Sequence, residues 1–282
     1  MYPIIFEYNG LVISSYGFML MIAFITCNFL LKKYLKSINV NPVIGDDLIF
    51  YAAIGGIVGA KIYYIIEYYP VNADGVSPGL DNLNGLKLIF QGIFSLTFTD
   101  ITTGISQFGT GLVFHGGFIG GLIAVSLYIK KNKLNWLTVS DWVAPYLALG
   151  HSIGRVGCFL VGDCYGKVSN MPWAISFPNG IPPTLARVHP TQLYETFIYF
   201  LIFLALYSYR KKTKIKGMIM IQYLFLAGIA RFLIEFYRVN PKYLLNLSSA
   251  QIISFFMILF SFILYYYSLN VKKNHHKTSN EE

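Results

Sequence analysis

Long apolar segments run through this chain, and they constrain its fold more than any other feature. Each is close to the roughly 20 residues that an α-helix needs to cross the hydrocarbon core of a membrane. Only 12% of the 282 residues are charged, whereas a soluble domain normally carries about 25%. We therefore predict an all-α, polytopic membrane protein that forms a single integral membrane domain over residues 1–282. The expected spans are 14–31, 46–69, 111–129, 137–156, 191–209, 217–237 and 250–270.

Clusters of basic residues follow every second one of these segments. They lie at 32–36, 130–133, 210–216 and 272–277. Because Lys and Arg gather on the cytoplasmic side of membrane proteins, the alternation predicts about seven transmembrane helices, with the N-terminus outside and the C-terminus cytoplasmic. The segments near 70–110 and 157–190 are then extracytoplasmic. In the first of these, the apolar piece 86–98 is too short to span, so we expect it to lie on the outer membrane face or dip into it.

The formal net charge of +9 is explained mostly by these clusters, so nucleic acid is not an expected partner. The three cysteines, Cys27, Cys158 and Cys164, include no C-x-x-C pair. Together with His151, two of them could be imagined as metal ligands, but the spacing matches no zinc motif. We therefore expect no metal.

Three charged residues lie in the outer half of the sixth apolar segment. Arg231, Glu235 and Arg238 follow the spacing i, i+4, i+7, which places them on one face of a helix. A charge in the hydrocarbon core costs a few kcal/mol and usually faces a bundle interior or a polar cavity. A purely structural interpretation is available, in which Glu235 pairs with one arginine and Arg238 extends to the membrane surface. Arg231 lies deeper, so we expect it to need an anion.

Other polar residues fall at the same level of the expected bundle. They are Tyr16, Lys61, His115 and Arg155 on the first four spans, with His189, Gln192, Tyr194 and Glu195 at the start of the fifth. Arginine binds phosphate oxygens bidentately, and a neutral histidine beside arginines is a candidate general base. These residue types predict an outward-facing site that modifies a phospholipid, without identifying the acceptor.

Two stretches of small residues have a simpler explanation. They contain Gly55, Gly56, Gly59 and Ala60 in one case and Gly116, Gly117, Gly120 and Gly121 in the other. Small residues at helical spacing allow close packing of membrane helices. The stretch GGIVGAK lacks the ending of a phosphate-binding loop, and His115 taken alone is compatible with a packing role.

These motifs together resemble the prolipoprotein diacylglyceryl transferase family, bacterial membrane enzymes that begin lipoprotein maturation. The matching stretches are SSYGFMLMIAF, GAKIYY, FHGGFIGG, VSDWVAPYLALGHSIGRVGCF, HPTQLYE and RFLIEFYR. The resemblance implies that the diacylglyceryl group of phosphatidylglycerol is transferred to the lipobox cysteine of a precursor lipoprotein, forming a thioether and releasing glycerol phosphate. It implies an active site at the extracytoplasmic leaflet of the bacterial cytoplasmic (inner) membrane. It also implies that no metal or organic cofactor is required.

The resemblance assigns roles to individual residues. His115 matches the essential histidine, the candidate base for the cysteine thiol, and Arg155 and Arg231 match the arginines that hold the lipid phosphate. Glu235 matches an acid that orients Arg231, and Tyr16 matches a tyrosine that lines the site. The other positions that we expect at the substrate site are Lys61, Gly157, Cys158, Asp163, Gly166, Glu195 and Arg238.

Several positions depart from the family pattern. Cys158 replaces a common asparagine, Lys61 an arginine and Ala227 a tyrosine. Two interpretations of Cys158 stay open: a disulfide with Cys164, or packing against a neighbouring helix. The alternative functions are a divergent homologue that modifies another acceptor and a transporter of anions or lipids. A transporter would need polar residues that continue into the cytoplasmic half, and often internal repeats, and neither is apparent in the sequence.

Overall fold

Two units of helices make up this chain. The computed structural model describes residues 2–8, 11–69, 77–109, 111, 113–213, 215–243 and 246–278. The first unit consists of Met1–Pro42 and Asn135–Glu282, and the second consists of Val43–Leu134. The expectation of a single domain over residues 1–282 stays a prediction.

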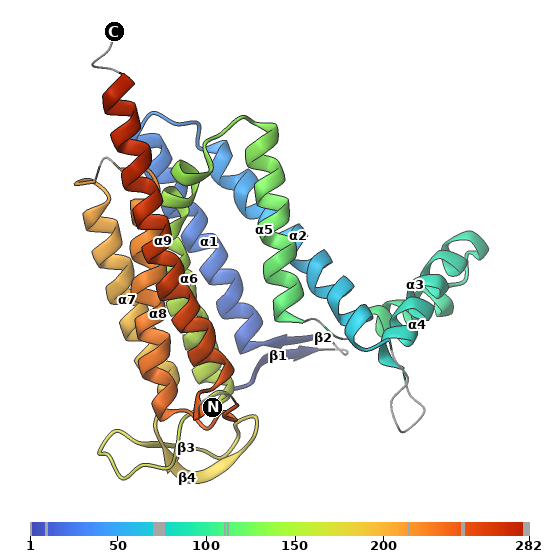
Figure 1. The fold of residues 1–282 in the computed structure, drawn as a ribbon. Coiled ribbons are helices and arrows are strands. Elements are labelled where there is room, and N and C mark those ends of the chain that lie inside the picture. Colours follow the sequence, from blue (N-terminus) through green and yellow to red (C-terminus); the bar gives the residue numbers. More distant parts are fainter. Residues whose placement is uncertain are drawn as a thin grey trace. The chain divides into compact units, whose positions relative to one another are not determined.

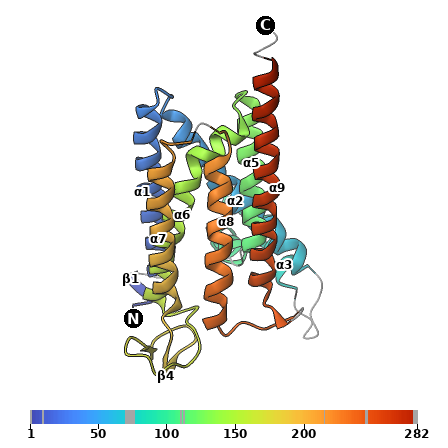
Figure 2. The same cartoon turned by 60° about the vertical axis from the view of Figure 1, so that its left-hand side comes forward.

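The first unit is a bundle in which one long helix, α6, is central. Figures 1 and 2 show that α6 (Trp136–Val161) packs against α1 (Ser15–Ser37), α7 (Thr191–Tyr209) and α8 (Met218–Ile234), while α9 (Ser249–Thr278) packs against α8. Ala144 and Ala148 on α6 are fully buried, because their small side chains allow several helices to approach it. This packing brings residues from α6, α7 and α8 together.

Two short antiparallel hairpins accompany the bundle. β1 (Ile4–Tyr8) pairs with β2 (Leu11–Ser14) before α1, and β3 (Ile175–Phe177) pairs with β4 (Thr184–Val188) between α6 and α7. Figure 1 shows β3 and β4 at the end of the bundle where α6 ends and α7 begins. The all-α prediction is confirmed in that the fold is essentially helical, although it did not include these hairpins.

A half-buried carboxylate fixes the start of α8. Asp141 on α6 accepts hydrogen bonds from the backbone N–H groups of Gly217, Ile219 and Met220, at 2.6, 2.8 and 3.0 Å. The first N–H groups of a helix have no partner within the helix, and they carry the positive end of its dipole. Asp141 therefore satisfies and neutralises this helix end, which aligns α8 with α6.

Large apolar side chains cover the outward faces of these helices. Phe29 on α1, Phe197 on α7 and Tyr266 on α9 are 66%, 62% and 70% exposed. Four helical segments are long and apolar enough to cross a membrane: Ser15–Ser37, Val43–Glu67, Met218–Tyr237 and Ser249–Leu269. Exposed apolar surface on this scale would be unfavourable in water. This apolar surface, together with the four long apolar segments, supports the conclusion that the chain is an integral membrane protein.

In the second unit, α2 (Val43–Glu67) pairs with α5 (Phe114–Lys131) through glycines. A Cβ added at Gly55 would lie 2.6 Å from the carbonyl oxygen of Gly120, and one added at Gly120 would lie 2.7 Å from the Cα of Gly59. Only glycine allows backbones to approach so closely. The packing interpretation of these small-residue stretches is confirmed.

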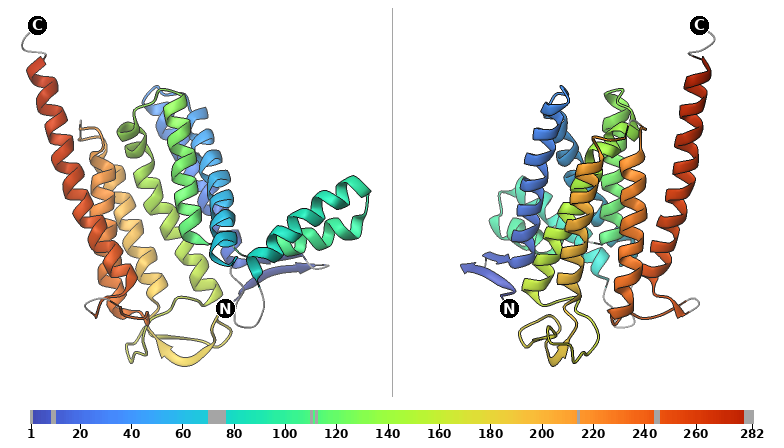
Figure 3. Two further views of the ribbon diagram at one scale, coloured as in Figure 1. Left: turned by 45° about the vertical axis from the view of Figure 1, so that its right-hand side comes forward. Right: turned by 90° about the vertical axis from the view of Figure 1, so that its left-hand side faces the viewer.

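The same unit contains a helical hairpin, α3 (Pro78–Ser95) and α4 (Phe98–Gly109), which Figure 3 shows leading away from the end of α2. Gly104 brings the two helices into contact, because a Cβ there would lie 2.6 Å from the carbonyl oxygen of Gly85. The sequence predicted only one apolar piece at 86–98. Residues 70–76 and 110 of the expected extracytoplasmic segment lie outside the described residues.

Each of the seven expected spans overlaps one helix in the described part of the chain, although Gly111 and Val113 of the third span precede α5. The end of the sixth differs from the prediction, because α8 stops at Ile234 and a 3-10 turn, η1 (Glu235–Tyr237), follows it. Arg238 comes after η1, in extended backbone. The prediction that Arg231, Glu235 and Arg238 share one helix face is therefore wrong for Arg238.

Candidate active site

Glu195, near the start of α7, is the centre of a group of charged side chains. Its Oε2 lies 2.7 Å from Nε of Arg155 and 3.2 Å from Nε2 of His151. Its Oε1 lies 3.0 Å from Nη1 of Arg231 and 3.0 Å from Nη1 of Arg238. Because the Glu195 side chain is fully buried, one carboxylate links charged groups that come from three different parts of the chain.

Glu235 is the second buried acid at this position. Its Oε2 lies 3.4 Å from Nη2 of Arg231 and 3.9 Å from Nε of Arg238, and Nδ2 of Asn240 donates a hydrogen bond to its Oε1. The expected contact between Glu235 and Arg231 is confirmed. The arginine cluster, as we use the term, consists of Arg155, Arg231 and Arg238 with Glu195 and Glu235.

The arginine cluster has three guanidinium groups and two carboxylates, which leaves one excess positive charge. Buried carboxylates are stable only when such charge-assisted hydrogen bonds replace their hydration. The side chains of Arg155 and Arg231 are 16% and 22% exposed, whereas that of Arg238 is 8% exposed. An anion can therefore reach Arg155 and Arg231 more easily, while Arg238 supports Glu195 from inside.

Arg238 is buried against Glu195 and Glu235 and does not extend outward, so that part of the structural interpretation is wrong. Its backbone forms a β-bridge with Gly166, and the N–H of Lys167 donates to the carbonyl oxygen of Tyr237 at 2.8 Å. A Cβ added at Gly166 would lie 2.5 Å from that carbonyl oxygen. Gly166 thus allows the loop after α6 to hold Arg238 against Glu195.

His151 also belongs to this site, although its sequence context suggested only a possible metal ligand. Besides its contact with Glu195, its Nε2 lies 3.4 Å from Nε of Arg155, and its ring stacks on Tyr199 at a centroid distance of 3.7 Å. The available signal was its i, i+4 spacing from Arg155. Within the described residues, no group of three or more His, Cys, Asp and Glu side chains is placed to hold a metal ion.

The loop after α6 brings further predicted residues to the arginine cluster. Cys158 is 7% exposed in the last turn of α6, and Nη1 of Arg155 approaches its sulfur at 3.9 Å. Gln192 Nε2 donates to the carbonyl oxygen of Asp163 at 2.6 Å, which ties this loop to α7. Burial raises the pKa of the Asp163 carboxyl. Cys164 follows directly in the same loop.

Gly157 allows α1 to approach the end of α6. A Cβ added at Gly157 would lie 3.3 Å from the Cα of Tyr16 and 3.1 Å from the Cβ of Met19. Tyr16 is 45% exposed at the start of α1. The structure therefore places Tyr16 beside the last turn of α6, and its contact with substrate stays a prediction.

Lys61 and His115 belong to the second unit. Lys61 Nζ donates to Oδ1 of Asn82 at 2.8 Å, to the carbonyl oxygen of Gly111 at 3.1 Å and to that of Phe108. These bonds attach the α3–α4 hairpin to α2. His115 is the second residue of α5 and is exposed. The expected contacts of both residues with substrate stay predictions.

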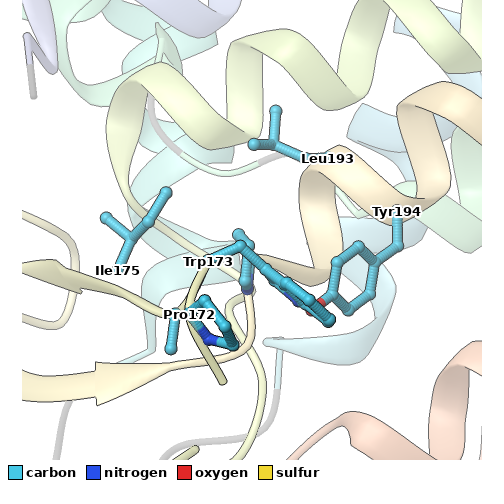
Figure 4. Close-up of a pocket in the computed structure, with 7 residues that line it drawn as sticks. Pro172, Trp173, Ile175, Leu193 and Tyr194 are labelled. Atoms are coloured by element: carbon cyan, nitrogen blue, oxygen red, sulfur yellow. The ribbon is translucent and has the colours of Figure 1, made fainter. Parts of the chain in front are cut away.

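An apolar pocket of about 490 Å³ lies beside the start of α7 (Figure 4). It is lined by Pro172, Trp173, Ala174, Ile175, Pro190, Leu193 and Tyr194. Nε1 of Trp173 donates a hydrogen bond to the Tyr194 hydroxyl at 2.6 Å, and Glu195 follows Tyr194 directly in the chain. The beginning of α7 therefore contributes both to this pocket and to the arginine cluster.

Known proteins resemble this chain over nearly its whole length. The family model described as prolipoprotein diacylglyceryl transferase matches residues 3–267. A phosphatidylglycerol–prolipoprotein diacylglyceryl transferase from Clostridium tetani is 34% identical over 271 residues, covering 94% of this chain and 97% of that protein. Transferase 2 of the same name from Clostridium perfringens is 35% identical over 265 residues, covering 92% of each. The relative from Chlorobaculum tepidum is 35% identical over 267 residues, covering 92% of this chain and 86% of that protein.

Proposed function

This chain belongs to the prolipoprotein diacylglyceryl transferase family, and we propose that its arginine cluster holds the phosphate of the lipid donor. The protein is a transferase that moves the diacylglyceryl group of phosphatidylglycerol to a prolipoprotein in lipoprotein maturation. The observation that carries the proposal is the charge balance of the cluster. Three guanidinium groups surround two buried carboxylates, and two of those groups are partly exposed.

The proposed chemistry is a displacement at carbon. The thiolate of the lipobox cysteine attacks the glyceryl carbon that carries the phosphate ester, so a carbon–sulfur bond forms. The carbon–oxygen bond breaks, and glycerol phosphate leaves with the electron pair. Because negative charge on this phosphate grows in the transition state, preorganised guanidinium groups lower the barrier. Arg155 and Arg231 are the residues that we propose for this role, since their side chains are the more exposed ones.

His115 is the proposed base that removes the proton of the acceptor thiol. The thiolate is the nucleophilic form of cysteine, and histidine changes its charge near neutral pH. Support comes from the match of His115 to the histidine of the family motif HGGxxGG and from its exposed position at the start of α5. The residues that we propose to shape the lipid site without reacting are Tyr16, Lys61, Gly157, Cys158, Asp163, Gly166, Glu195, Glu235 and Arg238.

We also propose that α1, α2, α5, α6, α7, α8 and α9 span the membrane, with the N-terminus outside. In the first unit, the basic cluster at 32–36 lies at the C-terminal end of α1, and the cluster that begins at Arg210 follows α7, at the end of the bundle opposite β3 and β4 (Figure 1). Positive charge favours the cytoplasmic side. Glu195 lies near the start of α7, at the β3–β4 end. The arginine cluster would then face the extracytoplasmic leaflet of the bacterial inner membrane.

A transfer assay tests this function. Purified protein is mixed with phosphatidylglycerol vesicles and a lipobox peptide that contains one cysteine, and the peptide is analysed by mass spectrometry. We expect a diacylglyceryl mass increment on the cysteine. Matched controls are the same peptide with serine in place of cysteine and vesicles of phosphatidylcholine alone. Correctly folded protein that adds no diacylglyceryl group from phosphatidylglycerol would contradict the proposal.

A further inference from the structure

His151 lies one turn before Arg155 on α6, and one nitrogen of its ring contacts two charged groups. This nitrogen, Nε2, lies 3.2 Å from Oε2 of Glu195. It also lies 3.4 Å from Nε of Arg155, which can donate a hydrogen bond to it. One ring nitrogen cannot donate to the carboxylate and accept from the guanidinium at the same time. The position of His151 is therefore compatible with two protonation states, one in which Nε2 accepts from Arg155 and one in which it donates to Glu195.

The charged groups around His151 act on its ring in opposite directions. A positive charge on the ring would be attracted by the buried carboxylate of Glu195 on α7 and repelled by the guanidinium of Arg155. Arg231 on α8 and Arg238 add to the repulsion from farther away, because they bind the other oxygen of Glu195, at 3.0 Å each. A negative charge that enters the site would therefore favour the protonated ring.

The neutral titratable groups beside this stretch of α6 are occupied elsewhere. The ring of Tyr199 on α7 stacks on His151 at 3.7 Å, while its hydroxyl donates to the carbonyl oxygen of Ala227 at 3.5 Å. The Cys27 sulfur on α1 donates to the carbonyl oxygen of Tyr146 at 3.3 Å. The His151 side chain is 30% exposed, so it can exchange a proton with water that enters the site.

The charge of the phosphate changes during the transfer. The phosphodiester of the lipid donor carries one negative charge, which matches the one excess positive charge of the arginine cluster. Glycerol phosphate is a monoester with close to two negative charges near neutral pH, because its second pKa is about 6. One negative charge is then left without a partner in a partly buried site, where an unpaired charge is costly.

From this geometry we infer that His151 is a further residue of the phosphate site, which takes up a proton as the leaving phosphate gains its second negative charge. The inference rests on the proposed function. Before transfer the ring is neutral. In the product complex the ring is charged and its Nε2–H donates to Glu195, so the guanidinium of Arg155 stays available to the phosphate. The proton comes from water in the site.

Calorimetry in different buffers counts the protons that binding takes up, independently of activity. Glycerol phosphate is titrated into purified protein at about pH 7.5, where the monoester is almost entirely a dianion, in buffers that differ in their enthalpy of ionisation. The slope of the binding enthalpy against the ionisation enthalpy of the buffer gives the number of protons taken up. We expect uptake of about one proton by wild type, the change in charge of one histidine. Glycerophosphoglycerol, a diester with one negative charge, should cause much less uptake.

Two variants assign the proton to a residue. His151→Gln keeps a polar side chain beside Glu195 but cannot take up a proton, so proton uptake should be lost. Its Kd for glycerol phosphate should rise by a factor on the order of five, as loss of a unit charge a few ångströms away implies. His189→Gln is the matched control, since His189 is hydrogen-bonded to Tyr194 at 3.1 Å and makes no contact with Glu195 that the structure describes. It should take up the proton as wild type does.

Binding of glycerol phosphate by wild type without proton uptake, or the same uptake by His151→Gln, would overturn the inference while leaving the phosphate site intact. Equal uptake with the monoester and the diester would also overturn it, and this comparison needs only the wild-type protein. His151→Asn replaces His151→Gln if the glutamine variant does not fold. Absence of binding by correctly folded wild type would instead contradict the phosphate site of the proposed function, and the inference with it.

Discussion

Nε of Arg155 lies 2.7 Å from Oε2 of Glu195, whose side chain is fully buried. This contact connects α6 to α7, and the same carboxylate also holds Arg231 and Arg238. Breaking a buried ion pair from one side leaves an uncompensated charge. Glu195 therefore determines both the stability of this end of the bundle and the orientation of the arginines.

Replacing Glu195 by glutamine should be strongly destabilising. The amide keeps the shape of the side chain but leaves three guanidinium groups with one carboxylate, at a cost of about 3–5 kcal/mol in the free energy of unfolding. Thermal unfolding of purified Glu195→Gln should show a clearly lower Tm. Glu67→Gln, at an exposed position on α2, is the matched control. Equal Tm values for the two variants would contradict this role of Glu195.

His115→Ala should lower kcat for transfer at least about a hundredfold, the usual contribution of a general base, with little change in the KM for phosphatidylglycerol. Raising the pH above the thiol pKa of about 8.5 should restore much of the rate, because the acceptor then ionises without a base. Phe118→Ala, at an exposed position on the same helix, controls for damage to α5. A rate deficit that persists unchanged at high pH would argue against a base.

Lys61→Met should loosen the α3–α4 hairpin. The variant keeps the length of the side chain but loses the hydrogen bonds to Asn82, Phe108 and Gly111. Limited proteolysis should then cut the segment near 70–110 faster than in wild type. Lys87→Met, which changes an exposed lysine of α3, should leave the cleavage rate unchanged. If both variants resist cleavage as wild type does, Lys61 does not anchor the hairpin.

Asp141→Ala should destabilise the start of α8 by about 2 kcal/mol, the upper end of the range for a lost helix cap. Three N–H groups would lose their acceptor. Asp141→Asn keeps one side-chain oxygen and should lose less stability. Chemical denaturation should show that stability falls from wild type to Asp141→Asn and further to Asp141→Ala. An alanine variant as stable as wild type would refute this role of Asp141.

The sequence predicts the helices of this protein well because hydropathy acts locally along the chain. The contact between Glu235 and Arg231 was also predictable, since the two residues lie one turn apart. The central position of Glu195 was not, because α6, α7 and α8 meet only in the tertiary fold. No local pattern shows that one carboxylate on α7 is shared by arginines from α6, α8 and the chain after η1.

Other features escaped prediction for related reasons. Arg238 was assigned to the helix face of Arg231, but the 3-10 turn at Glu235–Tyr237 and the bridge to Gly166 redirect it. The α3–α4 hairpin depends on backbone contact between Gly85 and Gly104, which are far apart in the sequence. Apolar composition alone could not reveal that pairing.

The central claim is that the arginine cluster binds the lipid phosphate. The rate of diacylglyceryl transfer by the variant Arg231→Ala tests this claim most directly. Steady-state rates are measured against phosphatidylglycerol concentration for wild type, Arg231→Ala and Leu233→Ala, an exposed apolar position on the same helix. We predict that kcat/KM falls at least about a hundredfold in Arg231→Ala, as for loss of a preorganised donor. Arg231→Lys should restore little of this activity, because the bidentate geometry is lost. Leu233→Ala should have the kcat/KM of wild type. Arg231→Ala with the kcat/KM of Leu233→Ala would contradict the account.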